Sequence, residues 1–377
     1  MGHIDREDQF PVSSYLTVKA NQRGIPLHDI FELTCRCNFQ CRMCYVHGKG
    51  DMAQQKKREL GTETWLEIAR EAKRCGTLTL LLTGGEVLMR EDFVELYRKI
   101  SEMGIRLTVN TNGSLMRKEV LDCFQAYPPG RVNISLYGSS EDTYERLCGN
   151  RAREKVTASI RALKKLGISV RTTMTLTPLN CRDMEAVCAF GSQEDTLVDV
   201  GTYTFPQIRI RERGYGQNDS RLTPEEAGRY RVRWERLRLT DEEFSQMASR
   251  RLGRPKDPDE SKPGEERLGD PIRCQAGRSA YWITWDGKMR PCGMMTEPET
   301  DLRKEGFEQA WQKIREMAAQ IHLPLECKSC RDKNICKVCA AMCLAETGRF
   351  DKKPEYVCRM AQAMRESYLA ELKKLEG

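Results

Sequence analysis

Strand-like and helix-like segments alternate six times between residues 30 and 205, and this alternation limits the fold of the 377-residue chain more than any other feature. Residues 77–83 form a continuous apolar run, which is typical of a strand buried on both faces. Residues 91–103 then repeat apolar side chains at helical spacing. Further strand signals lie at 30–34, 105–110, 131–137, 169–177 and 198–205, with helical segments at 115–127, at 153–166 and before the last strand. The pattern predicts an α/β fold with a parallel sheet and right-handed crossovers.

Three cysteines, Cys37, Cys41 and Cys44, follow the first strand with three and then two residues between them. Thiolates at this spacing can hold three corners of a [4Fe–4S] cube. No fixed fourth ligand is nearby, so one iron would stay open to a substrate or cofactor, and an open site favours chemistry over a structural role. The alternative is a zinc site or coincidence, although zinc sites of this kind usually pair two close cysteine doublets.

A second motif, Thr83-Gly84-Gly85-Glu86, closes the strand about forty residues further on. Two glycines let the backbone approach a ligand closely, and a carboxylate can pair with an ammonium group. Together the motifs resemble those of the radical S-adenosylmethionine (SAM) superfamily, in which the Gly-Gly-Glu segment holds the methionine amino group of SAM. The resemblance implies that these four residues bind SAM. It also implies a partial (β/α)6 TIM-like barrel with its site at the C-terminal strand ends.

Four more residues are expected to contact SAM on the same resemblance. The position before the third cysteine is usually aromatic but is Met43 here, with Tyr45 just after it, so we expect both near the adenine. Asn112 closes the third strand and Ser135 the fourth, and similar segments contact the ribose and carboxylate of SAM in relatives. An Asn-Gly pair is equally typical of a turn.

A departure from the family pattern lies at Cys148-Gly149, where many relatives have an Arg-Gly pair that binds the SAM carboxylate. Either another arginine substitutes or the contact is absent; the candidates are Arg146, Arg151 and Arg153. Cys148 and Cys35, which we expect near the barrel mouth, could donate a hydrogen atom to a radical. A buried structural thiol is the ordinary alternative.

Residues 273–377 contain eight cysteines, the number that two fully ligated [4Fe–4S] cubes require. Their spacing resembles the SPASM extension of radical SAM enzymes, which carries auxiliary [4Fe–4S] clusters. The resemblance implies one cluster on Cys327, Cys330, Cys336 and Cys358, and another on Cys274, Cys292 and a later cysteine. Where the family has one cysteine four residues after Cys336, this chain has Cys339 and Cys343. We expect both to complete the cluster on Cys274 and Cys292, here called the first auxiliary cluster; the cluster on Cys327, Cys330, Cys336 and Cys358 is the second. The alternative is that one of the two cysteines is a free thiol, and zinc is the alternative for the whole region.

The chain is expected to divide into four parts: an N-terminal extension (1–27), the radical SAM partial barrel (28–208), a bridge (209–272) and a small cysteine-rich SPASM domain (273–377). The bridge has a polar stretch with helical propensity at 223–251. A charged, Pro-rich stretch follows at 254–264, with too little apolar content to pack. We expect a mobile surface loop there, either a lid over the barrel mouth or a solvated linker.

Composition excludes several classes of function. The net charge of +7, from 62 basic and 55 acidic residues, is a mild excess and does not indicate a nucleic-acid-binding protein. No run of eighteen apolar residues predicts a membrane span. Seventeen cysteines without a secretion signal favour metal ligands in a reducing cytoplasm, and exposed clusters favour an anaerobic host.

The resemblance implies a reaction: reductive cleavage of SAM to methionine and a 5′-deoxyadenosyl radical, which abstracts hydrogen from the substrate. SPASM relatives mostly modify peptides or proteins, so we expect a ribosomally made peptide to be cross-linked, epimerised or oxidised. A flavodoxin or ferredoxin would supply electrons. Only 36 residues precede Cys37, which are too few for a leader-binding domain at that end. We expect either a separate leader-binding protein or the 209–271 region to recognise the peptide.

Three alternatives stay open at this point. A sugar or amino-sugar dehydrogenase or epimerase would act on a small molecule, and an epimerase would require a cysteine donor such as Cys148. Sulfatase-type maturation is disfavoured because Gly293 and Met294 follow Cys292 where an acidic residue is expected. A non-catalytic zinc or iron–sulfur protein would bind no SAM.

Overall fold

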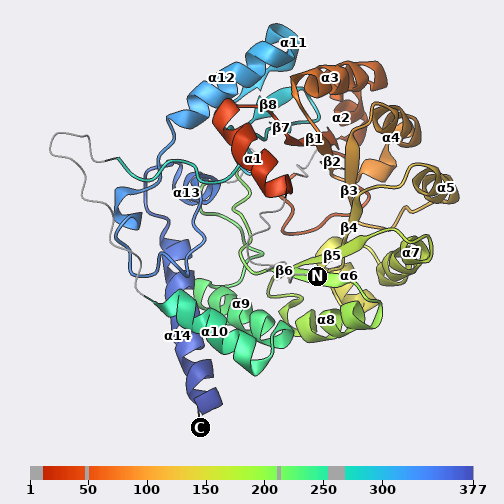
Figure 1. Cartoon of the computed structure of the whole chain (residues 1–377). Coiled ribbons are helices and arrows are strands. Elements are labelled where there is room, and N and C mark those ends of the chain that lie inside the picture. Colours follow the sequence, from red (N-terminus) through yellow and green to blue (C-terminus); the bar gives the residue numbers. More distant parts are fainter. Residues whose placement is uncertain (1–11, 47–50, 210–213, 254–267, 377) are drawn as a thin grey trace, which may run out of the picture.

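The structure is a computed structural model that describes residues 12–46, 51–209, 214–253 and 268–376. Its described residues form one sheet of nine strands in the order β6-β5-β4-β3-β2-β1-β7-β8-β9. The first six strands are parallel to their neighbours and curve into an open barrel (Figure 1). They are β1 (His28–Thr34), β2 (Thr79–Gly84), β3 (Arg106–Thr111), β4 (Arg131–Ser135), β5 (Val170–Thr175) and β6 (Leu197–Gly201). The predicted parallel α/β sheet is confirmed.

Helices cover the outer face of this barrel (Figure 1). In α4, Phe93, Leu96, Tyr97 and Ile100 are buried at helical spacing against the sheet, as the sequence predicts. Parallel neighbours need such crossovers because a short turn cannot return the chain to the start of the next strand. The outer helices are α2 (Met52–Arg58), α3 (Thr62–Cys75), α4 (Phe93–Glu102), α5 (Lys118–Ala126), α6 (Glu141–Cys148), α7 (Arg153–Lys165) and α8 (Met184–Gln193).

The predicted helical stretch at 223–251 forms two helices, α9 (Pro224–Arg238) and α10 (Asp241–Leu252). Each begins with a capping box, in which the threonine and the glutamate three residues later satisfy each other's backbone N–H groups. Both helices pack on the C-terminal helix α14 (Glu355–Glu376). The predicted charged loop at 254–264 lies outside the described residues.

The C-terminal region extends the barrel sheet, which the sequence analysis did not predict. Strand β7 (Trp282–Ile283) pairs in parallel with β1, and β8 (Lys288–Arg290) and β9 (Thr300–Asp301) continue the sheet in antiparallel fashion. Helices α11 (Leu302–Glu305) and α12 (Phe307–Ala319) follow, and α13 (Ala340–Thr347) lies among the last cysteines. The N-terminal helix α1 (Val12–Arg23) is joined to this region, since the Trp311 indole donates to the Gly24 carbonyl at 2.9 Å.

No helix among the described residues is long and apolar enough to cross a bilayer.

Candidate functional site

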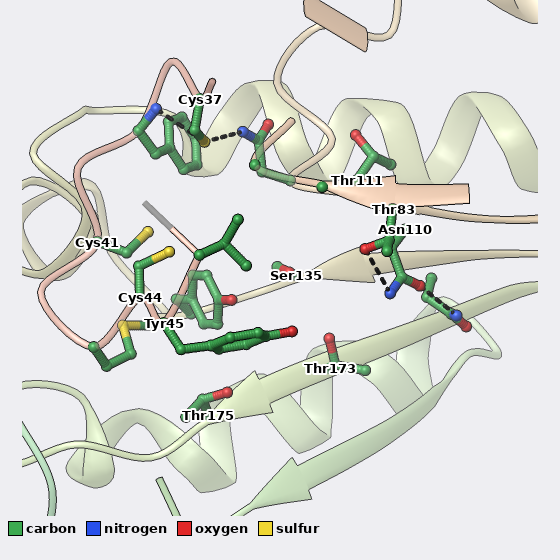
Figure 2. Close-up of a pocket in the computed structure, with 18 of the residues that line it drawn as sticks. Cys37, Cys41, Cys44, Tyr45, Thr83, Asn110, Thr111, Ser135, Thr173 and Thr175 are labelled. Atoms are coloured by element: carbon green, nitrogen blue, oxygen red, sulfur yellow. Dashed lines mark hydrogen bonds between the residues drawn. The ribbon is translucent and has the colours of Figure 1, made fainter. Parts of the chain in front are cut away.

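A cavity of about 370 Å³ lies inside the barrel, at the C-terminal ends of its strands. The three cysteines of the loop after β1 line one end of it (Figure 2). Polar side chains from β2 to β5 line the rest, among them Thr83, Asn110, Ser135, Thr173 and Thr175. The cavity therefore joins a thiol-bearing loop to a polar barrel interior.

The cysteine loop is held in place by a buried ion pair next to it. Arg36 donates two hydrogen bonds of 3.0 Å to the Glu59 carboxylate, and both side chains are almost fully buried. Arg90 donates to the carbonyls of Leu33 and Leu60 at 2.9 and 3.1 Å. These contacts fix the chain between β1 and Cys37, so the loop is preorganised by the protein.

The three cysteines of this loop all line the same cavity. Burial raises the pKa of Cys37 to about 12, and the charges of Glu86, Cys41 and Cys44 add to this rise. Cys37 Sγ accepts from the Phe39 amide at 3.4 Å and from Asn112 Nδ2 at 3.8 Å. The three thiols thus share one cavity, and thiolates are the usual ligands of iron–sulfur clusters. The donor set fits a [4Fe–4S] cluster with three protein ligands.

Gly84 and Gly85 press directly against the loop that carries the cysteines. The Gly85 amide donates to the Thr34 carbonyl and the Glu86 amide to the Arg36 carbonyl, each at 2.8 Å. A Cβ on Gly85 would lie only 2.2 Å from the Arg36 carbonyl oxygen. Both glycines also line the cavity. They are therefore required for backbone packing as well as for access to a ligand.

Glu86 differs from the prediction. Its carboxylate is fully buried and does not line the cavity. It accepts hydrogen bonds from the Leu88 amide (3.0 Å), the Thr111 hydroxyl (2.7 Å) and the Asn112 amide (2.6 Å). Burial raises its pKa, and these three hydrogen bonds oppose that rise. Glu86 therefore joins the end of β2 to the end of β3 by hydrogen bonds, and the cavity is lined by Gly84 and Gly85 instead.

The other predicted SAM contacts meet at the cavity. Met43, Tyr45, Thr83, Asn112 and Ser135 all line it. The Asn112 side chain bridges the two halves of this wall, because its Nδ2 donates to Asn38 Oδ1 at 2.9 Å and its Oδ1 accepts from the Ser114 amide at 2.9 Å. The Asn-Gly turn reading also holds, since Gly113 has a φ of +76°.

Cys148 lies away from the cavity. It is the last residue of α6, fully buried, and is not part of the cavity lining. A hydrogen bond with Cys148 is the largest cause that raises the pKa of Cys41. The prediction that Cys148 donates a hydrogen atom therefore has no geometric support. Cys148 instead contacts the cysteine loop, because its carbonyl accepts from the Gln40 amide.

None of the three arginines proposed for the SAM carboxylate lines the cavity. Arg151 instead pairs with Asp142 and Glu145 on the surface, at 2.8 and 2.7 Å. Among the described residues, Arg171 on β5 is the only charged side chain in the lining, and the sequence analysis missed it. A signal was available: Asn133 and Ser135 on β4, like Arg171, Thr173 and Thr175 on β5, alternate at the two-residue period of an inward-facing strand surface.

Four of the C-terminal cysteines surround a second cavity. Cys327, Cys330, Cys336 and Cys358 all line it. Burial raises the pKa of Cys336 to about 12, with further contributions from the charges of the other three. This is the predicted ligand set of the second auxiliary cluster, and its donors fit one.

The remaining thiols form a different group next to β8. Burial raises the pKa of Cys292 to about 11, and the charges of Cys339 and Cys274 add to it. Cys343 lies one helical turn beyond Cys339 on α13 and is fully buried. Burial raises its pKa, and the charges of Cys327 and Cys339 add to this rise. Cys274 and Cys339 thus influence Cys292, whereas Cys343 is influenced by cysteines on both sides; we call Cys274, Cys292 and Cys339 the first auxiliary group.

Residues 31–191 match the radical SAM superfamily. The AdoMet-dependent heme synthase of Methanosarcina barkeri is 23% identical over 339 residues, which span 86% of this chain and 94% of that protein. The subtilosin biosynthesis protein AlbA of Bacillus subtilis is 26% identical over 283 residues, spanning 74% of this chain and 57% of AlbA.

The fold is shared with a solved structure. Streptococcus suis SuiB bound to its precursor peptide SuiA superposes with a TM-score of 0.63 at 16% identity, covering 95% of this chain and 84% of SuiB. SuiB has also been solved bound to S-adenosylmethionine. At this identity the likeness concerns the fold, which includes the C-terminal cysteine-rich region as well as the barrel.

Proposed function

The chain belongs to the radical SAM superfamily, and we propose that it uses SAM and three [4Fe–4S] clusters to modify a ribosomally made peptide. The observation that carries this proposal is the cavity at the strand ends, which is lined by three thiols of one loop, a glycine pair and the polar barrel interior. When bound, the cluster and SAM would supply a 5′-deoxyadenosyl radical; the protein positions the reactants and excludes competing hydrogen donors.

The residues of this chain divide the work of binding SAM between them. Cys37, Cys41 and Cys44 would hold the cluster. The exposed backbone of Gly84 and Gly85 offers carbonyl groups to an ammonium group, because no side chain stands between this backbone and the cavity. Glu86 would support this segment through its three hydrogen bonds.

Further contacts would orient the rest of the cofactor. Met43 and Tyr45 would contact the adenine, and Asn112 and Ser135 the ribose and carboxylate. Arg171 supplies a cation at the inner wall of the cavity, where a carboxylate of SAM or of the substrate would be stabilised by a charge-assisted hydrogen bond. All five residues line the cavity, and the part of SAM assigned to Met43, Tyr45, Asn112 and Ser135 is what the family resemblance implies.

A peptide substrate is supported by two relatives. AlbA takes part in bacteriocin biosynthesis, and SuiB is solved with a precursor peptide. The two C-terminal thiol groups would hold auxiliary clusters that accept an electron from, or return one to, the product radical. A flavodoxin or ferredoxin would reduce the clusters, and a separate protein would bind the leader. A reducing cytoplasm is the proposed location, because all 17 cysteines are free of disulfides and must stay reduced to bind iron.

The test is an anaerobic purification followed by metal analysis and SAM cleavage with dithionite. About twelve irons per chain are expected, with 5′-deoxyadenosine produced by the wild type and absent from the Cys37/Cys41/Cys44→Ala variant. Precursor peptides encoded beside the protein should then lose hydrogen in mass spectra if they are cross-linked or oxidised, or take up deuterium from heavy water if they are epimerised. Iron without cleavage of SAM would contradict the proposal, and so would cleavage with no peptide product.

A second candidate substrate is a tetrapyrrole. The match to the heme synthase covers nearly all of that protein, more than the match to AlbA covers of AlbA. An iron-porphyrin precursor added to the same assay would separate the two: its conversion, with no change in any peptide, would favour the heme-related reaction.

A further inference from the structure

A buried ion pair joins Glu32 on β1 to Arg209, next to the strand β7 of the C-terminal region. Arg209 donates from both terminal nitrogens to the two carboxylate oxygens, at 2.7 and 2.9 Å. The Glu32 side chain is 0% exposed and that of Arg209 is 9% exposed. The Trp282 indole on β7 donates a third hydrogen bond to the same carboxylate, at 2.8 Å. A buried pair of this kind adds little stability over apolar side chains of the same size, so stability alone does not explain it.

The guanidinium touches both cluster-bearing loops. It lies 5.9 Å from the centre of the Tyr45 ring, one residue after Cys44. It also donates to the carbonyl of Gly293, one residue after Cys292, at 3.3 Å. Cys44 belongs to the SAM-binding group and Cys292 to the first auxiliary group. One buried cation therefore lies beside the ligands of two different proposed clusters.

The orientation of the pair directs its positive end toward both loops. The guanidinium makes the contacts with Tyr45 and Gly293, whereas the carboxylate faces Arg209 and the Trp282 indole. The contacts of Arg209 with Tyr45 and Gly293 therefore lie one residue from Cys44 and Cys292, and neither is next to a cysteine of the second auxiliary group in the chain.

We propose that Arg209 is an electrostatic bridge that raises the reduction potentials of the SAM-binding cluster and of the first auxiliary cluster together. A cluster gains one unit of negative charge when it takes up one electron, and a cation held beside it in a low-dielectric interior stabilises that reduced form. Arg209 is a positioning residue, since it acts through the cluster ligands and does not line the cavity. The inference rests on the cluster assignments of the proposed function.

The experiment measures the midpoint potential of each cluster by EPR-monitored titration of the full chain, purified anaerobically. In Arg209→Gln the two bridged clusters should become harder to reduce, with the reduced fraction at a fixed potential falling roughly threefold or more. The cluster on Cys327, Cys330, Cys336 and Cys358 should keep its potential and serves as the internal control. Arg209→Lys, which restores a cation, should recover most of the shift.

A double variant separates charge from folding. Arg209→Gln alone leaves the Glu32 carboxylate buried without a partner, which is strongly destabilising. Glu32→Gln with Arg209→Gln removes both charges and keeps the size and polarity of the pair. With wild-type iron content, this variant should show a fall of the same sign in the two potentials, smaller than in Arg209→Gln because it removes the dipole of the pair and not a net charge.

Three results would overturn the inference: unchanged potentials in both variants, an equal shift of all three clusters, or loss of the bridged clusters even from the double variant, which would make the pair a structural clamp only. Failure of the proposed function is separate, because it would show as missing iron or absent SAM cleavage in the wild type.

Discussion

Gly85→Ala tests whether the glycine pair is needed for packing against the cysteine loop. The new Cβ would lie 2.2 Å from the Arg36 carbonyl oxygen and 2.7 Å from the Cys35 carbonyl oxygen, and both are backbone atoms that cannot rotate away. Gly85 does not have a positive φ, so the effect is steric and not one of backbone strain. The loop before Cys37 must therefore move.

The magnitude follows from what this movement breaks. Two backbone hydrogen bonds, from Gly85 to Thr34 and from Glu86 to Arg36, join the two segments. Each contributes about 1 kcal/mol net, and overpacking a well-packed site costs about 1–3 kcal/mol. We expect Gly85→Ala to lower the free energy of unfolding by about 3 kcal/mol. The N-terminal cluster should assemble poorly, because its ligands follow the displaced segment directly.

Urea unfolding followed by circular dichroism, together with iron counting, measures both effects. Gly61→Ala is the matched control: no atom lies within 4 Å of its added Cβ, and its φ is −73°. It should change the unfolding free energy by less than about 1 kcal/mol and leave the iron content unchanged. A Gly85→Ala protein with wild-type stability and full iron would refute the steric reasoning.

Three further predictions concern buried groups. Cys339→Ser should remove about four irons whereas Cys343→Ser should keep them, because Cys339 lies with Cys274 and Cys292 and Cys343 does not; equal loss in both would restore Cys343 as a ligand. Glu86→Gln replaces an acceptor with a donor near the Asn112 amide, so it should lower stability by about 2 kcal/mol in urea unfolding; loss of SAM binding at unchanged stability would instead indicate direct contact with SAM. Burial raises the pKa of Asp29 well above its ordinary value, so the folded state binds a proton more readily than the unfolded chain, and stability falls as pH rises through that window. Asp29→Asn should remove this part of the pH dependence, which begins near the ordinary aspartate pKa of about 4 and extends upward, and an unchanged slope in the variant would contradict the assignment.

Much of the fold follows from sequence because its signals are local. Each barrel strand overlaps a predicted strand segment, and α4 buries the face that its periodicity indicates. The cluster ligands are predictable for a similar reason, since the spacing of Cys37, Cys41 and Cys44 within one loop determines how they can converge. The two-residue alternation of β5 also predicts that Arg171 faces the barrel interior, although its residue type alone gave no such indication.

The rest depends on contacts between distant segments. Glu86 was expected to face SAM, but its carboxylate instead accepts hydrogen bonds from the Leu88 and Asn112 amides. Asn112 lies on the loop after β3, far from Glu86 in the sequence. Cys148 was expected at the barrel mouth, yet α6 ends behind the cysteine loop, where the Gln40 amide donates to its carbonyl at 2.8 Å. Neither orientation leaves a periodic trace in the sequence.

The pairing of β7 with β1 explains how two cluster loops from opposite ends of the chain can share one cation. A strand of two residues gives no sequence signal of its own, but its register, Ile30 with Trp282 and Phe31 with Ile283, places the Trp282 indole beside Glu32. Strand β8 then leads directly to Cys292. The spacing between the SAM-binding loop and the first auxiliary group is therefore set by hydrogen bonds within one sheet, which keeps the two proposed clusters in a fixed relation.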